Sequence, residues 1–251
     1  MLPLNSSLLR TVWLLSIALL CSAPNLQTPA APTAVPLATE PHHQLVLENS
    51  YVRVYRVSIP AHSATLLHQH DLPYVSVSLG PADFVNAVPG KPEVHVVLAD
   101  GQIGYSRGGF AHIARTDSGV AFNNVTIELL KPQGDPQNVC AKIVPAATSV
   151  PCPETPAGSE NEIFGPPQFK TDEVTVRLAS HGPNGSVVVG PVQATLFVIV
   201  SGSEIQRTVN GKPEETLSAG SVVWLPPASK TTFANRSGKP WTVLSLSFEG
   251  N

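Results

Sequence analysis

The sequence contains an internal repeat, and this repeat constrains the fold more than any other feature. The segment Gly90–Glu93 (Gly-Lys-Pro-Glu) recurs as Gly211–Glu214, each time as a turn between two runs of β-forming residues. Three further pairs of segments align in the same order along the chain: Ser76–Gly80 with Val198–Gly202, Gly101–Arg107 with Gly220–Pro226, and Phe122–Leu129 with Trp241–Phe248. Because an ordered set of matches indicates duplication, we expect two homologous units, over residues 42–131 and 166–251.

Both units are predicted to consist of β-strands. Short runs of β-branched and aromatic residues, such as Tyr51–Ile59 and Leu196–Val200, are bounded by turn residues, and no helical periodicity is sustained after residue 42. Charged residues make up only 13% of the chain and 25 residues are Pro, which excludes a coiled coil. A net charge of −3 leaves no basic surface for nucleic acid. The pattern favours an all-β fold of the sandwich or barrel type.

The N-terminus is predicted to direct export. Arg10 precedes an apolar run, Thr11–Leu20, which is too short to span a bilayer, and small residues follow it, as in a signal peptide over residues 1–23. Lipidation at Cys21, as in a bacterial lipoprotein, is the less favoured alternative, because the preceding Leu20 is not small. The protein is therefore expected to be periplasmic or secreted, from a bacterial source, with no transmembrane segment in the mature chain.

Two segments lie outside the repeated units. Residues 24–41 are rich in Pro, Ala and Thr and are predicted to form an extended tether. Residues 132–165 form a Pro-rich connector that contains Cys140 and Cys152. These two cysteines are expected to pair as a disulfide in an oxidising compartment, the alternative being two unrelated loop thiols.

Three histidines of the first unit are the best candidates for chemistry. His68 and His70 are two residues apart, so that both side chains lie on one face of a strand. His112 follows the turn residues Gly108 and Gly109, where the chain can double back tightly. Neutral imidazole is a favoured ligand of Fe, Zn, Ni and Cu, so three facing imidazoles indicate a transition-metal or ligand site. The alternative is a strand that carries two surface histidines.

At these residues the chain resembles the cupin superfamily, and specifically its two-domain members (bicupins). The second cupin motif runs Gly, five residues, Pro, one residue, Gly, two residues, His, three residues, Asn; Gly101, Gly109 and His112 fall on this spacing, with Arg107 and Thr116 at the Pro and Asn positions. The second unit matches this motif at Gly220, Pro226 and Asn235. Ala228 and Thr231 stand at its second Gly position and its His position.

The resemblance implies a fold and a set of ligands. Each unit is expected to form a double-stranded β-helix, or jelly-roll barrel, with the three histidines at the mouth of the first barrel. Tyr74 stands where the family usually has a Glu ligand, so we expect it to hydrogen-bond a bound water or ligand rather than to hold a metal. The second unit, with Thr231 in place of His, is expected to be a structural half or to hold a dry pocket.

Other polar residues of the first unit are given simpler interpretations. His95 is expected to be solvated or to support the site from outside. Glu128 alternates with apolar residues and is expected to point outward, because an inward Glu128 would need the opposite register. Arg107 and Arg115 flank His112 and are candidates for binding an anion, although solvated surface arginines are commoner.

The sequence predicts one function and one alternative. The first is an exported bicupin that binds a divalent metal (Fe, Mn, Ni or Zn), a small-molecule ligand, or both, through His68, His70 and His112. The alternative is a three-His metal-dependent enzyme of the dioxygenase type that acts on a small organic substrate. Pairing of two chains through barrel edges is expected from the resemblance alone.

Overall fold

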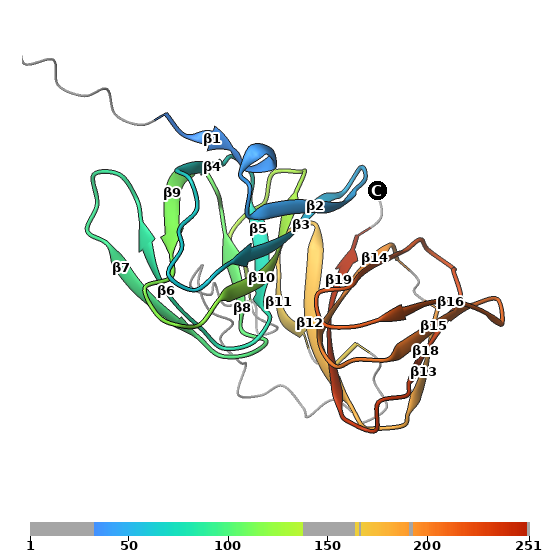
Figure 1. Ribbon diagram of the computed structural model, residues 1–251. Helices are drawn as coiled ribbons and strands as arrows, with labels where there is room; N and C mark the ends of the chain where they lie inside the picture. Colours follow the sequence, from blue (N-terminus) through green and yellow to red (C-terminus); the bar gives the residue numbers. More distant parts are fainter. Residues whose placement is uncertain (1–32, 138–163, 166, 191–192, 250–251) are drawn as a thin grey trace, which may run out of the picture. The chain divides into compact units, whose positions relative to one another are not determined.

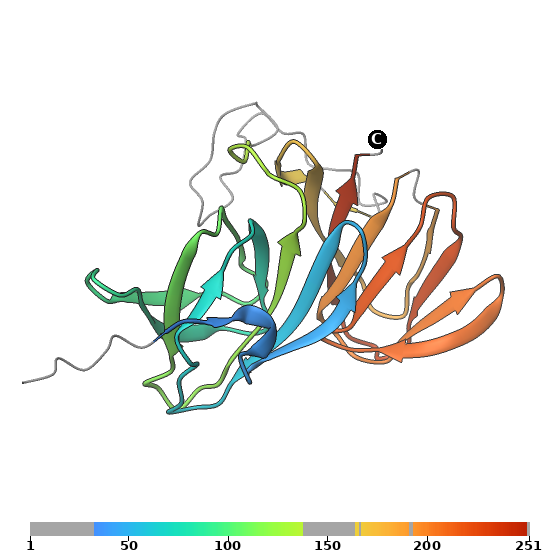
Figure 2. The ribbon, with the colours of Figure 1, turned by 90° about the horizontal axis from the view of Figure 1, so that it is seen from above.

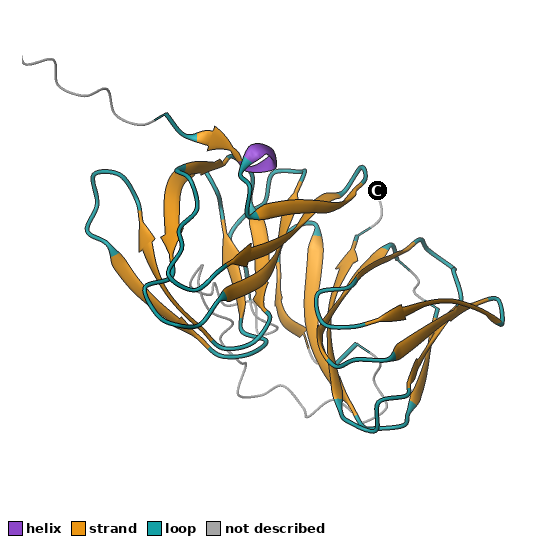
Figure 3. Cartoon of the chain, viewed as in Figure 1, coloured by secondary structure: helices purple, strands orange, loops and turns teal. Residues whose placement is uncertain are grey.

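The computed structural model describes residues 33–137, 164–165, 167–190 and 193–249 (Figure 1). The predicted signal peptide, the first part of the predicted tether, and Cys140 and Cys152 lie outside these described residues. Strands make up nearly all of the regular structure, and η1 (Leu37–Thr39) is a single 3-10 turn (Figure 3). Within the described ranges, no helix has the length and apolar character that crossing a membrane requires.

The first barrel is built from two five-stranded sheets. One sheet has the order β1-β4-β9-β6-β7 and the other the order β2-β3-β10-β5-β8. The strands are β1 (Val35–Pro36), β2 (His43–Glu48), β3 (Val52–Ile59), β4 (His68–His70), β5 (Tyr74–Ser78), β6 (Ala82–Ala87), β7 (Val94–Leu98), β8 (Ile103–Ser106), β9 (Phe110–Arg115) and β10 (Phe122–Leu129).

The second barrel repeats this plan over the C-terminal half of the chain. Its sheets have the orders β11-β12-β19-β14-β17 and β13-β18-β15-β16. Figure 2 separates its orange and red strands from the blue and green strands of the first barrel. The strands are β11 (Pro167–Lys170), β12 (Val174–His181), β13 (Ser186–Val189), β14 (Thr195–Ser201), β15 (Ile205–Val209), β16 (Lys212–Leu217), β17 (Val222–Leu225), β18 (Thr231–Asn235) and β19 (Trp241–Phe248).

One hydrophobic cluster is shared by the two barrels. It joins alternate residues of β5 and β10, such as Val77, Val125 and Ile127, to alternate residues of β14 and β19, such as Val198 and Leu244. The opposite faces of these strands point into their own barrels. Neither face of β5, β10, β14 or β19 is therefore left to solvent, and apart from Glu128 of β10 the residues of these strands are apolar or neutral.

The two barrels differ in how their interiors are filled. The second barrel packs large apolar side chains inward, including Phe197, Phe233 and Trp241, in one buried cluster. The first barrel has smaller polar residues on the equivalent strands, among them Ser76 and Thr126, and it encloses a cavity of about 330 Å³. The two halves thus share a fold, and the first contains the cavity.

Two expectations differ from the structure. Residues 33–41 belong to the predicted tether, but they pack on the first barrel as β1 and η1, because Leu37 and Glu40 are buried there. Glu128, expected to point outward, is buried on the same face of β10 as Asn124 and Thr126. The expectation assumed that one face of β10 meets water, whereas β10 lies in the middle of its sheet with both faces covered.

Candidate metal centre

The three histidines singled out in the sequence meet at one end of the first barrel. His68 lies directly opposite His112 in the antiparallel pairing of β4 with β9, and His70 is two residues further along the same face of β4. The turn before β9 requires glycine: Gly108 has φ +69°, and a Cβ there would lie 2.2 Å from the carbonyl oxygen of Leu72. This close packing holds β9 beside β4.

Nε2 of His70 lies close to Nε2 of both other rings. The distance between Nε2 of His68 and Nε2 of His70 is 3.2 Å, and that between Nε2 of His70 and Nε2 of His112 is 3.1 Å. His68 donates its Nδ1–H to the carbonyl oxygen of Leu66 at 2.9 Å, and His112 donates its Nδ1–H to Oδ1 of Asn86 at 2.6 Å. In a neutral imidazole, donation from Nδ1 leaves a lone pair on Nε2.

This arrangement fits a cation. The lone pairs of His68 and His112 face His70, whose own Nδ1 is buried and has no hydrogen-bond partner. Whichever nitrogen of His70 carries the proton, one buried polar group of the cluster lacks a partner, which is costly away from water. A metal ion among the three Nε2 atoms satisfies the lone pairs of all three rings once the proton of His70 is on Nδ1.

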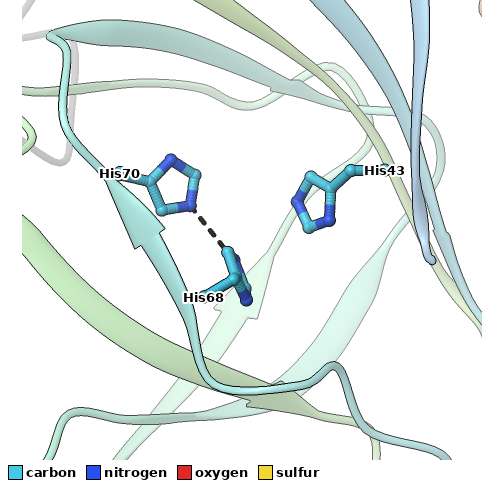
Figure 4. Close-up of side chains that lie close together, drawn as sticks. All are labelled: His43, His68 and His70. Carbon is cyan, nitrogen blue, oxygen red and sulfur yellow. Dashed lines mark hydrogen bonds between the residues drawn. The ribbon is translucent and has the colours of Figure 1, made fainter. Parts of the chain in front are cut away.

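A fourth histidine, missed by the sequence analysis, completes the cluster. His43 begins β2, and its ring centroid lies 4.7 Å from that of His68 and 6.2 Å from that of His70. Each of these three buried histidines offers a nitrogen, and the three nitrogens lie within 4.8 Å of one another (Figure 4). His43 stands outside both cupin motifs, so their spacing gave no reason to select it. The pair of adjacent histidines at 42 and 43 was the available indication.

Glu40 fixes the orientation of His43. Its buried carboxylate accepts hydrogen bonds from Nδ1 of His43 at 2.5 Å and from Nδ1 of His42 at 3.0 Å. The backbone N–H groups of His42 and Leu66 donate to the same carboxylate at 2.8 and 3.2 Å. Burial opposes the charge of Glu40, but these hydrogen bonds prevail and lower its pKa to about 2. An ionised Glu40 keeps the proton of His43 on Nδ1 and leaves the lone pair on Nε2.

All four histidines are neutral near pH 7. Burial lowers the pKa of His70 to about 2, that of His112 to about 3 and that of His43 to about 4, and it also lowers the pKa of His68. Charged neighbouring imidazoles would repel one another and lower the pKa of His70 and His112 further. A metal competes with protons for imidazole nitrogen, so neutral rings are in the form that binds metal.

Tyr74 lies beside the cluster and lines the cavity. Its ring stacks on that of His70 with a centroid distance of 4.5 Å, and the Phe110 ring stacks on His70 at 5.7 Å. Burial raises the pKa of Tyr74, although a hydrogen bond with Ser106 opposes this shift. The phenol is therefore neutral, and it covers one face of His70.

The two arginines near His112 pair with acidic residues. Arg107 forms an ion pair with Asp135, and Arg115 forms ion pairs with Glu93 at 3.1 Å and with Asp117 at 2.7 Å. Neither arginine is among the described residues that line the cavity. The structure therefore does not support the anion-binding role considered for them from the sequence.

Comparison with solved structures identifies the fold. AerE from Microcystis aeruginosa matches with a TM-score of 0.54 and 9% identity, over 84% of this chain and 99% of that one. The chain has the two-barrel cupin fold. At this identity the likeness concerns the fold alone. No protein-family model matches the sequence, and the comparison with curated proteins likewise found no match.

Two other solved structures match with lower scores. A cupin 2 conserved barrel domain protein from Leptotrichia buccalis has a TM-score of 0.47 and 10% identity, over 82% of this chain and 88% of that one. A salicylate 1,2-dioxygenase from Pseudaminobacter salicylatoxidans has a TM-score of 0.48 and 10% identity, over 78% of this chain and 70% of that one.

Proposed function

We propose that the first barrel binds one divalent transition metal through Nε2 of His68, His70 and His112 and presents it to a small molecule in the cavity. The convergence of these nitrogens, with the tautomers of His68 and His112 set by acceptors on Nδ1, is the observation that carries the proposal. Imidazole ligands suit Fe, Ni and Zn, three of the four metals expected from the sequence. A metal bound there would act as a Lewis acid on a ligand oxygen.

The protein's own residues support this role in three ways. His43, held by Glu40, offers a further nitrogen from β2, on a different sheet from the other three histidines. Tyr74 and Phe110 cover His70 with aromatic rings. The cavity beside the rings gives a small molecule access to the same nitrogens.

Metal analysis of protein purified without chelator tests the proposal. We expect about one equivalent of Fe, Mn, Ni or Zn per chain, bound at purification or taken up on addition, and loss of this metal in the variant His68→Ala/His112→Ala. The control is His95→Ala, since His95 is exposed and pairs with Asp83 away from the cluster. Wild-type protein that neither contains nor takes up any of the four metals would contradict the proposal.

A second candidate function is oxygen-dependent cleavage of a small organic substrate at the same site. It is favoured by the cavity, which lies directly beside the histidines and is large enough for more than a solvent molecule. Oxygen uptake by Fe²⁺-loaded protein with candidate substrates separates the two functions. Uptake that depends on substrate and on His112 supports an enzyme, whereas metal binding without uptake supports a binding protein.

Export is also part of the proposal, and it is supported by the sequence of residues 1–23 alone. Fractionation of cells that express the full chain tests it. We expect the protein in the periplasm or the medium, with a new N-terminus after the apolar run. Uncleaved protein in the cytoplasm would contradict export.

A further inference from the structure

The described residues that line the cavity of the first barrel include no carboxylate and no strong base. Among the described residues, the lining includes no Asp, Glu, Lys or Arg, and its polar members besides the histidines are hydroxyl and amide groups. The volume of about 330 Å³ lies at the low end of the range for small-molecule sites, which is about 300–1,000 Å³. The occupant is therefore small, and only the metal can neutralise a charge on it.

The metal-binding end can accept one anionic group. Three neutral imidazoles leave the full positive charge of a divalent ion uncompensated, so a carboxylate or phenolate oxygen on that ion is favourable. A second anionic group further into the cavity would meet no cation, because Arg107 and Arg115 are paired with carboxylates elsewhere. Burying an unpaired charge is strongly unfavourable.

The wall of the cavity suits a planar apolar body. The rings of Phe84 and Phe122 stack with centroids 4.3 Å apart and an angle of 8°, and both line the cavity. Ile59, Val96 and Leu98 extend this apolar surface. Aromatic ligands gain from offset stacking on such rings as well as from apolar burial.

A short polar strip lies further into the barrel. Ser76 follows Tyr74 by two residues on β5, so the two residues are about 7 Å apart along the strand. Ser76 lies directly opposite Thr126 of β10. The hydroxyl of Thr126 donates to Oδ1 of Asn124 at 3.0 Å, so the amide of Asn124 keeps its N–H groups for another acceptor. The strip can hydrogen-bond a neutral hydroxyl or carbonyl group, and it cannot neutralise a carboxylate.

We infer that the ligand of this site is a small aromatic monoanion, which binds the metal through its anionic oxygen and places a neutral polar substituent on the strip of Ser76, Asn124 and Thr126. This inference rests on the proposed metal site. It excludes dianions whose second charge lies away from the metal, because that charge has no partner in the cavity.

Calorimetric titration of Zn²⁺-loaded full-length protein tests the inference, after the zinc content has been measured. The probes share one benzoate group and differ at the far end of the ring: benzoate, 4-hydroxybenzoate and terephthalate. We expect 4-hydroxybenzoate to bind at least tenfold more tightly than terephthalate. Terephthalate that binds as tightly as 4-hydroxybenzoate would overturn the inference.

The variant Thr126→Val tests the polar strip at nearly constant volume. Loss of one hydrogen-bonding group is expected to weaken the binding of 4-hydroxybenzoate about 2- to 10-fold and to leave the affinity for benzoate unchanged. The control Ser245→Ala removes a buried hydroxyl at the corresponding position of the second barrel, and we expect it to change neither affinity. Equal weakening of both probes by Thr126→Val would overturn the role of the strip.

The zinc content distinguishes failure of the ligand inference from failure of the proposed metal site. Protein that holds Zn²⁺ but binds neither benzoate nor 4-hydroxybenzoate overturns the inference about the ligand and leaves the metal site standing. Protein that holds no metal overturns the proposed function, and the inference falls with it.

Discussion

Replacing Glu40 with Gln tests whether the buried carboxylate organises the metal centre. The side chain of Glu40 is fully buried, and each of its oxygens accepts two hydrogen bonds. Gln replaces one of these oxygens with an NH₂ group, so the two N–H groups that donated to that oxygen then face a hydrogen-bond donor. If the NH₂ group takes the position beside His43, that ring must move its proton to Nε2, and the nitrogen that His43 offers to the metal is lost.

The magnitude follows from the hydrogen bonds that are lost. Hydrogen bonds to a charged group contribute about 1.5–3 kcal/mol each. Because neighbouring bonds are not additive and the Gln side chain keeps two of them, we expect the free energy of unfolding to fall by about 2–4 kcal/mol. Removal of a group that orients a metal ligand typically weakens metal binding about 10- to 100-fold.

Two measurements check this prediction. Urea denaturation gives the free energy of unfolding, and titration against a chromophoric chelator gives the zinc affinity. The matched control is Glu48→Gln, which removes the exposed ion pair between Glu48 of β2 and Arg53 of β3 and should cost less than about 1 kcal/mol. A folded Glu40→Gln protein that binds zinc as tightly as the wild type would refute the role given to Glu40.

Two further predictions concern pH and the turn before β9. The metal-free protein should lose stability as the pH falls from about 6.5 to 4.5, because His70 (pKa about 2) and His112 (pKa about 3) stay neutral in the fold while the unfolded chain takes up protons. Each ring is expected to lower the free energy of unfolding by up to about 1.4 kcal/mol per pH unit in this range. Urea denaturation at pH 7, 6 and 5 measures this change, and a free energy of unfolding that does not vary with pH would contradict the burial of the rings. Gly108→Ala should destabilise the fold by more than about 2 kcal/mol and reduce metal content, because its Cβ would collide with Leu72. Gly109→Ala is the control, since it has a similar positive φ and no atom within 4 Å of its Cβ, and equal losses in both variants would show that close packing is not the cause.

The repeat and the histidine spacing predicted much of what the structure contains. Two aligned sets of strand-like runs were enough to indicate two related all-β units, since strand periodicity and turn residues are local properties. The spacing of His68 and His70 placed both rings on one face, and the Gly-Gly turn brought His112 to them, as the pairing of β4 with β9 shows. That these residues bind a metal stays a prediction.

The features that were missed depend on contacts between distant segments. His43 reaches the cluster because Glu40 and Leu37 bury residues 33–41 on the barrel, and composition alone predicted an extended tether there. Glu128 was assigned to solvent because alternation in one strand does not reveal whether a neighbouring barrel covers its outer face. The cavity likewise depends on the side chains of many strands together, and no single run of the sequence predicts it.

X-ray absorption spectroscopy of the zinc-loaded protein identifies the atoms bound to the metal. The account predicts three or four nitrogen ligands at about 2.0–2.1 Å, with the outer-shell scattering of imidazole rings, and loss of this signature in His68→Ala/His112→Ala. Zinc surrounded by oxygen alone, or an unchanged spectrum in that variant, would contradict it.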